Sequence, residues 1–89
     1  MRIEPDTTKD VVTRLRRAGG QIQGVITMLE TGRDCGEVVA QLAAVSRALD
    51  RAGFRLLAGQ LRDCLSASAS AEEHGADLER LEKLFLSLA

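Results

Sequence analysis

Two cysteines are the residues of this chain whose type can do covalent or metal chemistry. Cys35 lies in "GRDCGE" and Cys64 in "LRDCLS", and the 89 residues contain no third cysteine. On one straight helix their separation of 29 positions corresponds to about 43 Å, so the two thiols of one chain cannot meet. The same number of 100° steps leaves a rotation of only about 20°, so both thiols point from one face of that helix.

An antiparallel pair of such helices brings the thiols together between chains. If the helices cross near Leu49 and Asp50, Cys35 of one chain lies beside Cys64 of the other, and two-fold symmetry creates a second identical site. The alternative is that both are buried cysteines that fill small gaps in a core. We favour the inter-chain site, because one helix face carries both thiols at its opposite ends.

The two thiols are expected to differ in reactivity. Cys35 lies in the first turn of its helix, where the helix dipole and free N–H groups favour the thiolate, and Arg33 adds positive charge. Cys64 lies near a helix C-terminus beside Asp63, which disfavours the thiolate. The sequence therefore predicts Cys35 as the attacking nucleophile and Cys64 as the resolving thiol.

The elements that must position these thiols are all helical. Apolar residues recur at helical spacing, no segment alternates like a strand, and Pro5 is the single proline. The prediction is one all-α domain over residues 1–89 with three helices. Its parts are helix one at about 7–31, helix two at about 35–65, a flexible linker at about 66–75 and helix three at about 76–88.

Capping residues define the helix ends. Asp6 or Thr7 is expected to cap helix one, Gly32 to end it, and "DCGE" to form a capping box with Asp34 as N-cap and Glu37 at N3. Three glycines interrupt helix one at a cost of roughly 1 kcal/mol each. They indicate close approach to a packed helix or to a nucleic-acid phosphate; they are Gly19, Gly20 and Gly24.

Size and composition favour self-association. Phe54 and Phe85 are the only aromatic residues of the chain, and so short a chain buries only about two-thirds of its unfolded surface. Three helices with a long middle helix cannot close around so thin a core. We therefore predict an antiparallel helical dimer along helix two.

Charge and hydropathy restrict the location and the partners. The net charge is −1, with a basic first third and an acidic tail, a pattern compatible with DNA binding on one face or with ordinary solvated helix surface. No signal-peptide core and no apolar run of roughly 18 residues is present, so we expect a cytoplasmic protein without a membrane partner. Thiols are normally kept reduced in the cytoplasm.

The sequence resembles a known family. "RLRRAGGQIQGVITMLETGRDCGEVVAQLAAVSRAL" followed by "LAGQLRDCL" is similar to the copper-sensing repressors of the CsoR/RcnR type, over about residues 8 to 65. The resemblance implies an all-helical, DNA-binding transcriptional repressor, not an enzyme, that assembles as a dimer of dimers. It also implies effector sites between protomers.

The resemblance points to a particular effector. The positions that bind Cu(I) in the family's copper sensors correspond to Cys35, Gln60 and Cys64, and Gln60 replaces a histidine; an amide is a poor ligand for soft copper. The lone His74 lies in the expected linker and is expected to be solvated. Two cysteines without the histidine resemble the persulfide-sensing (CstR-like) branch, which implies sulfane-sulfur donors as effectors, a disulfide or polysulfide bridge and no cofactor. The alternative is a Cu(I) sensor that uses Cys35 and Cys64 alone.

The resemblance also implies a DNA-contacting surface. Its role is phosphate neutralisation more than base reading, because no helix-turn-helix is recognisable. Gly19 departs from the family, which commonly has an acidic residue there. A helical scaffold or thiol carrier that binds no DNA is the alternative of another class. The expected contacts to operator DNA are Arg14, Arg16, Arg17, Gln21 and Arg47.

Overall fold

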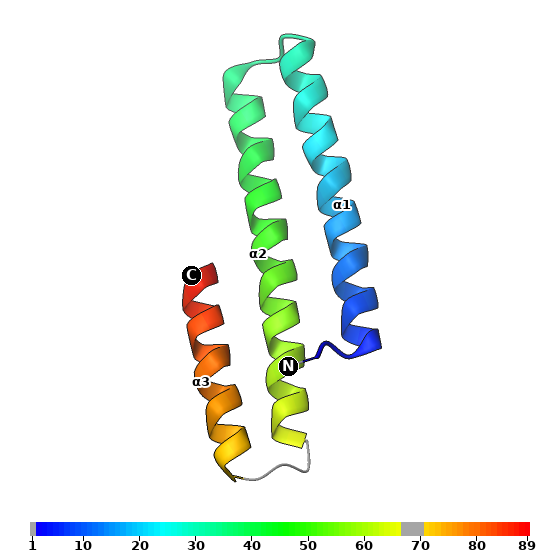
Figure 1. Cartoon of the computed structure of the whole chain (residues 1–89). Helices are drawn as coiled ribbons and strands as arrows, with labels where there is room; N and C mark the ends of the chain where they lie inside the picture. Colours follow the sequence, from blue (N-terminus) through cyan, green and yellow to red (C-terminus); the bar gives the residue numbers. More distant parts are fainter. Residues whose placement is uncertain (1, 67–70) are drawn as a thin grey trace.

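A computed structural model describes residues 2–66 and 71–89, and these residues form three α-helices without a strand. The helices are α1 (Pro5–Glu30), α2 (Cys35–Ser66) and α3 (Ala71–Leu88). The chain reverses direction at each connection, so that α1 and α3 both pack against the long α2 (Figure 1). The all-α, three-helix prediction is confirmed.

The molecule is a thin rod. Its principal extents are 57 × 24 × 12 Å and its radius of gyration is 17.2 Å, whereas a compact domain of this length has a radius of about 12 Å. Within the described residues α1 and α3 do not pack on each other. In the described part of the chain, α1 and α3 each pack only against α2. Much of the apolar surface of the helices therefore stays uncovered.

Small side chains at seven-residue intervals join α1 to α2. A seven-residue repeat keeps one seam of each helix facing its neighbour, as in left-handed coiled coils. The single-chain core is correspondingly narrow, since the residues of this seam are valine, alanine and glycine. The buried seam consists of Val11, Ala18 and Val25 on α1 and of Val38, Val45, Ala52 and Gly59 on α2.

The two helices approach most closely where Thr7 meets Gly59. Thr7 is 7% exposed, and a Cβ built on Gly59 would lie 2.7 Å from Thr7 Cγ2. The prediction that Asp6 or Thr7 caps helix one is wrong. The N-cap is Glu4, with φ −60° and ψ 142°, and Pro5 occupies the first turn, where its fixed φ and missing N–H are favourable.

Gly59→Ala is expected to destabilise the protein by about 1–2 kcal/mol. The methyl group would force α1 and α2 apart, and this overpacking outweighs the gain in helix propensity. Gly20→Ala is the matched control, because it has open space around its Cβ position and should stabilise by up to about 1 kcal/mol. Urea unfolding followed by circular dichroism measures both. Adding Thr7→Ala should restore most of the loss; a Gly59→Ala protein as stable as the parent would contradict the tight contact.

Glycines in the middle of α1 face open space among the described residues. A Cβ at Gly19, Gly20 or Gly24 would meet nothing within 4 Å. The predicted close approach to a packed helix or to a nucleic-acid phosphate is therefore not made by another helix of the described chain. A second chain or a nucleic-acid phosphate remains as the partner that would use the open backbone.

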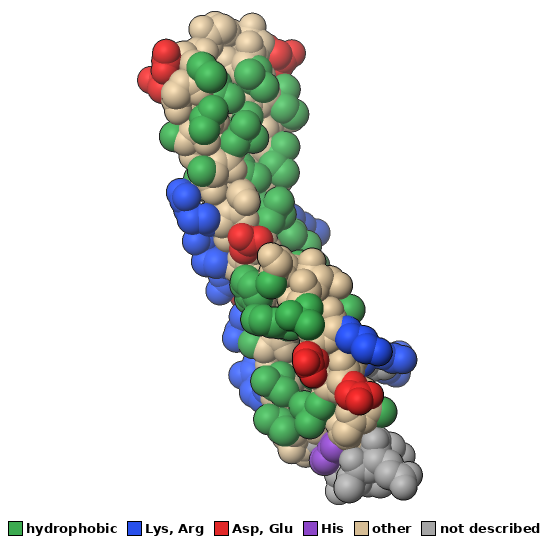
Figure 2. Space-filling model, turned by 90° about the vertical axis from the view of Figure 1, so that its left-hand side faces the viewer, with side chains coloured by type: hydrophobic (Ala, Val, Ile, Leu, Met, Phe, Trp, Pro, Cys, Tyr) green, Lys and Arg blue, Asp and Glu red, His purple; other side chains and the backbone are tan. Residues whose placement is uncertain are grey.

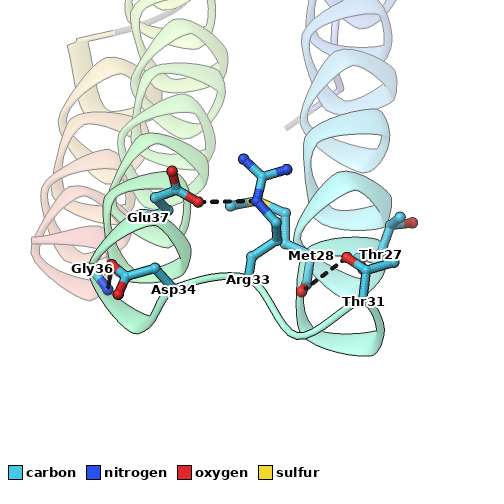
Figure 3. A network of polar contacts seen from close by, with 7 residues as sticks. All are labelled: Thr27, Met28, Thr31, Arg33, Asp34, Gly36 and Glu37. Carbon is cyan, nitrogen blue, oxygen red and sulfur yellow. Dashed lines mark hydrogen bonds and ion pairs between the residues drawn. The ribbon is translucent and has the colours of Figure 1, made fainter.

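The connection between α1 and α2 follows its expected capping residues, with one exception (Figure 3). Gly32 has φ +74°, its N–H donates to the Leu29 carbonyl and the next N–H donates to that of Met28, as glycine-terminated helices do. Asp34 accepts a hydrogen bond from the Gly36 N–H at 3.0 Å and thus caps α2.

The predicted capping box is only half formed. Glu37 does not reach back to the N-cap; it accepts a hydrogen bond from Arg33 Nε at 3.0 Å. Arg33 was expected to add positive charge beside Cys35, and the carboxylate of Glu37 offsets much of that charge. Cys35 itself is the first residue of α2, beside the free N–H groups of the helix N-terminus.

Helix α3 begins at Ala71, five positions before the expected start. The second half of the predicted linker, residues 71–75, is therefore helical. Alanine and glutamate are strong helix formers, and "AEEH" outweighs the low complexity that suggested a linker. His74 lies within α3 and is half-buried, so its expected place in a solvated linker is wrong; residues 67–70 lie outside the described residues.

Helix α3 packs antiparallel along the C-terminal half of α2. The rings of Phe54 and Phe85 are 5.4 Å apart at 47°, Leu81 is buried, and the Leu88 side chain lies over Gly53. None of the described helices is long and apolar enough to cross a membrane.

Candidate effector site and nucleic-acid interface

The two cysteines lie at opposite ends of α2. Cys35 is the first residue of the helix, Cys64 lies near its last, and both thiols are free. Because α2 is unbroken between them, the thiols of one chain are about 43 Å apart. Cys35 is exposed, whereas Cys64 is only 7% exposed. The structure thus separates the predicted pair within a chain and makes Cys35 the thiol that a dissolved reagent reaches first.

A line of exposed apolar residues continues from Cys35 along α2. Leu42 and Leu49 follow at seven-residue intervals, with 50% and 43% of their surface exposed. The helix that packs beside them adds further uncovered residues, so α1 and α2 together present an apolar face to the solvent. The exposed apolar residues of α1 are Val12, Leu15, Ile22, Ile26 and Leu29.

Gln60 lies one turn before Cys64 and is bound to the N-terminal segment. Its side chain is 6% exposed, and its Nε2 donates a hydrogen bond to the Arg2 carbonyl at 3.0 Å. Figure 1 shows the N-terminal segment passing from the start of α1 across α2. The amide thus has a structural partner within the chain.

The donor set fits Cu(I) only in part. In the described part of the chain, no three side chains of His, Cys, Asp or Glu gather to hold a metal. Two thiolates from different protomers suit a soft ion such as Cu(I), whereas the Gln60 amide does not. Copper would therefore be held by Cys35 and Cys64 without a third strong ligand.

Arginine side chains converge on a groove between α1 and α2. Arg14, Arg17 and Gln21 line this groove of about 130 Å³ together with Ala48 and Arg51 of α2. Figure 2 shows Lys and Arg side chains along one edge of the middle of the rod, beside a face with many hydrophobic side chains. A groove lined by three guanidinium groups suits a phosphate backbone.

Arg51 is not among the DNA contacts expected from the sequence. Arg16 and Arg47, which are among the expected contacts, are exposed and do not line the groove. The spacing of three arginines could have indicated Arg51. Arg47, Arg51 and Arg55 recur every four residues and so share one face of α2.

Asp10 joins the arginines of the two helices. It accepts a hydrogen bond from Arg55 Nε at 2.6 Å, and its other oxygen lies 3.4 Å from Arg14 Nε. The Arg55 hydrogen bond, aided by the charges of both arginines, lowers the pKa of Asp10 below its usual 3.8. The stabilising contribution of Asp10 is thus complete above pH 3.8 and is lost as the pH falls through the lowered pKa. At neutral pH it fixes Arg14 at the rim of the groove.

Residues 7–87 match the family model for metal-sensitive transcriptional repressors. The chain belongs to this family. The family consists of transcriptional repressors and not of enzymes, and the resemblance found in the sequence is confirmed at this level.

Curated relatives and solved structures agree with this assignment. The copper-sensing transcriptional repressor CsoR of Mycobacterium ulcerans is 38% identical over 71% of this chain and 54% of its own length. The copper-sensing transcriptional repressor RicR of Mycobacterium tuberculosis is 36% identical over 72% of this chain and 67% of its own length. The chain thus spans about half the length of the first of these relatives.

Two solved structures share the fold. A variant of the formaldehyde-responsive regulator FrmR from Salmonella enterica serovar Typhimurium superposes with a TM-score of 0.84 at 25% identity, over 97% of this chain and 98% of that one. The nickel-responsive transcriptional regulator InrS superposes with a TM-score of 0.78 at 33% identity, over 91% of each chain. The effectors in these names differ from relative to relative, so the effector of this chain must be argued from its own residues.

Proposed function

We propose that this protein is a cytoplasmic, operator-binding repressor that senses reactive sulfur. Operator affinity falls when Cys35 of one protomer becomes joined to Cys64 of the partner subunit. The observation that carries the proposal is the pair of free thiols at opposite ends of one unbroken helix, separated by a whole number of turns to within about 20°.

The assembly that this proposal needs is an antiparallel dimer along α2, which pairs again into a tetramer. The exposed line of Cys35, Leu42 and Leu49 supports it, because a soluble monomer rarely leaves so many large apolar side chains uncovered along one face. Leu49 lies midway between the cysteines and therefore close to the two-fold axis. Two helices that cross there bring each Cys35 to the opposite Cys64.

Leu49→Asp is expected to weaken dimerisation by at least about a hundredfold, because a carboxylate buried at the axis has no partner. Sedimentation velocity at micromolar concentration measures the change. Ala40→Asp is the control, since Ala40 is exposed and lies nine residues earlier, on the opposite side of α2. A parent protein that sediments as a stable, folded monomer would remove the basis of the inter-protomer site.

The chemistry is a two-step sulfur transfer. The Cys35 thiolate attacks the terminal sulfur of a persulfide, which leaves Cys35 persulfidated and releases the donor as a thiolate. The Cys64 thiolate of the partner subunit then attacks the inner sulfur of that persulfide. A disulfide forms between the protomers and hydrosulfide leaves. No metal or cofactor takes part in either step.

The DNA surface is assigned to the arginine groove. Arg14, Arg17 and Arg51 neutralise phosphates from the groove, and the exposed Arg16 and Arg47 with Gln21 extend this surface along both helices. Arg47 and Arg51 lie on α2, the helix that the sulfur link would join to α2 of the partner subunit, and the other contacts lie on α1, which packs against α2. A covalent link fixes the angle at which the two α2 helices of the dimer cross. Operator affinity falls because the arginines on the two protomers then no longer match the spacing of the phosphates.

Copper is the second candidate effector, and the names of the curated relatives favour it. Two thiolates from facing protomers form an acceptable Cu(I) site. Gln60 argues against copper as the main effector, because its amide occupies the position of a third ligand and is already bound to the Arg2 carbonyl.

Titration of the reduced protein on a labelled operator fragment distinguishes the two effectors. We expect a persulfide donor to release DNA at near-stoichiometric amounts and dithiothreitol to restore binding. Cu(I), buffered to picomolar free concentration, should leave the complex intact. Fluorescence anisotropy measures both titrations, and release by copper with no response to persulfide would establish the copper alternative.

A further inference from the structure

The first described residues form an extended strap. Residues 2–4 precede α1, Glu4 has extended backbone angles of φ −60° and ψ 142°, and the segment runs from the start of α1 to the C-terminal half of α2 (Figure 1). The strap is tied there by the hydrogen bond from Gln60 Nε2 to the Arg2 carbonyl. A side chain 58 positions away thus holds the start of this segment, while its last residue, Glu4, accepts the first hydrogen bond of α1 from the Thr8 N–H.

Gln60 is a polar residue at a buried position of α2. Gln60 and Thr7 are the buried polar side chains of the described chain, and a buried amide needs a hydrogen-bond partner. The strap supplies that partner with a backbone carbonyl. Loss of the strap would leave the amide unsatisfied, and loss of the amide would remove the hydrogen bond that ties the strap to α2.

The two cysteines differ in exposure although they share one face of α2. Cys35 and Cys64 have nearly the same angular position on α2, and Gln60 lies on the Cys64 side of that same face. At the Cys35 end the thiol is exposed, whereas at the Cys64 end α3 packs on α2, the strap is tied one turn away at Gln60, and the thiol is 7% exposed. The position of a thiol on this face therefore does not by itself decide its exposure.

We propose that Gln60 is a latch that holds the strap over Cys64, and that the strap must lift before this thiol reacts. The proposal deepens the proposed function, since an antiparallel partner would bring its Cys35 to the place that the strap occupies. The latch makes Cys64 the late, resolving thiol. It also keeps Cys64 from direct attack by small oxidants while Cys35 is unmodified.

Alkylation of Cys64 by iodoacetamide tests the latch without any sulfur donor. All variants carry Cys35→Ser, so that Cys64 is the one thiol of the full-length protein, and intact mass follows the rate. Gln60→Met keeps the length of the side chain but has no donor, and we expect it to speed alkylation about tenfold, the factor that one hydrogen bond represents. Deletion of residues 2–4 should speed it equally.

The combined variant and a matched control complete the design. Gln60→Met together with the deletion should react no faster than the deletion alone, because both remove the same cover. Gln41→Met, at an exposed position of α2, should react like the parent. Helicity by circular dichroism must match the parent; if Gln60→Met is misfolded, the deletion with Gln60 intact carries the test.

Unchanged Cys64 rates in both the folded Gln60→Met variant and the deletion would overturn the latch. So would fully additive accelerations, which would indicate general loosening of the fold. Because alkylation needs no persulfide, a failed latch leaves the sulfur-sensing proposal in place, and a protein that ignores persulfide leaves the latch in place.

Discussion

Replacing Arg14, Arg17 and Arg51 together by alanine is expected to weaken operator binding about a hundredfold near physiological salt. Each lost phosphate contact removes roughly 0.9 from the slope of log affinity against log salt, so the slope should fall by nearly three. The effect should be similar for specific and non-specific DNA, since phosphates carry no sequence information directly. Anisotropy titrations at several salt concentrations give both quantities.

The acidic third helix offers the control for this prediction. Arg80→Ala with Lys83→Ala removes two positive charges from exposed positions of α3, away from the groove, and should leave the salt slope unchanged. All variants should remain assembled, which sedimentation checks. If the triple variant keeps the parental slope, the groove between α1 and α2 is not the DNA surface.

A persulfide donor is expected to convert nearly all of the protein into a covalent dimer on a non-reducing gel. Cys64→Ala should stop at a monomer with one added sulfur atom on Cys35. Cys35→Ala should react slowly or not at all, because its remaining thiol is buried. The exposed, helix-N-terminal position of Cys35 accounts for this order of reaction.

Release of DNA should accompany the cross-link and not the first sulfur transfer. Persulfidated Cys64→Ala protein should therefore still bind the operator. Release of DNA by this variant at parental donor concentrations would show that modification of Cys35 alone suffices, and the bridge would have no regulatory role.

The fold could be predicted wherever local chemistry decides it. Gly32 and Asp34 end α1 and begin α2 as their residue types indicate, because each satisfies backbone groups within a few positions. The predicted linker overlaps the start of α3, because low-complexity composition suggests a linker although alanine and glutamate have high helix propensity. Pro5 at N1 displaced the expected cap for an equally local reason.

The site could be predicted only in part, since its remaining features depend on contacts between helices. Helix geometry alone places Cys35 and Cys64 on one face, but their different exposure depends on what packs over each end. Arg51 joins Arg14 across the helix interface, and the bond from Gln60 to Arg2 spans almost the whole sequence. Periodicity within α2 can indicate Arg51, but it does not reveal which residues of another segment lie opposite.

Mixing two single-cysteine variants tests the bridge between protomers most directly. Cys35→Ala and Cys64→Ala chains with different affinity tags are refolded together, treated with a persulfide donor, and resolved on a non-reducing gel before peptide mass spectrometry. Inter-protomer bridging predicts no covalent dimer from either variant alone and a covalent heterodimer from the mixture, joined between Cys35 and Cys64. A mixture that forms heterodimers but never cross-links them, while the parent protein does cross-link, would contradict the proposed site.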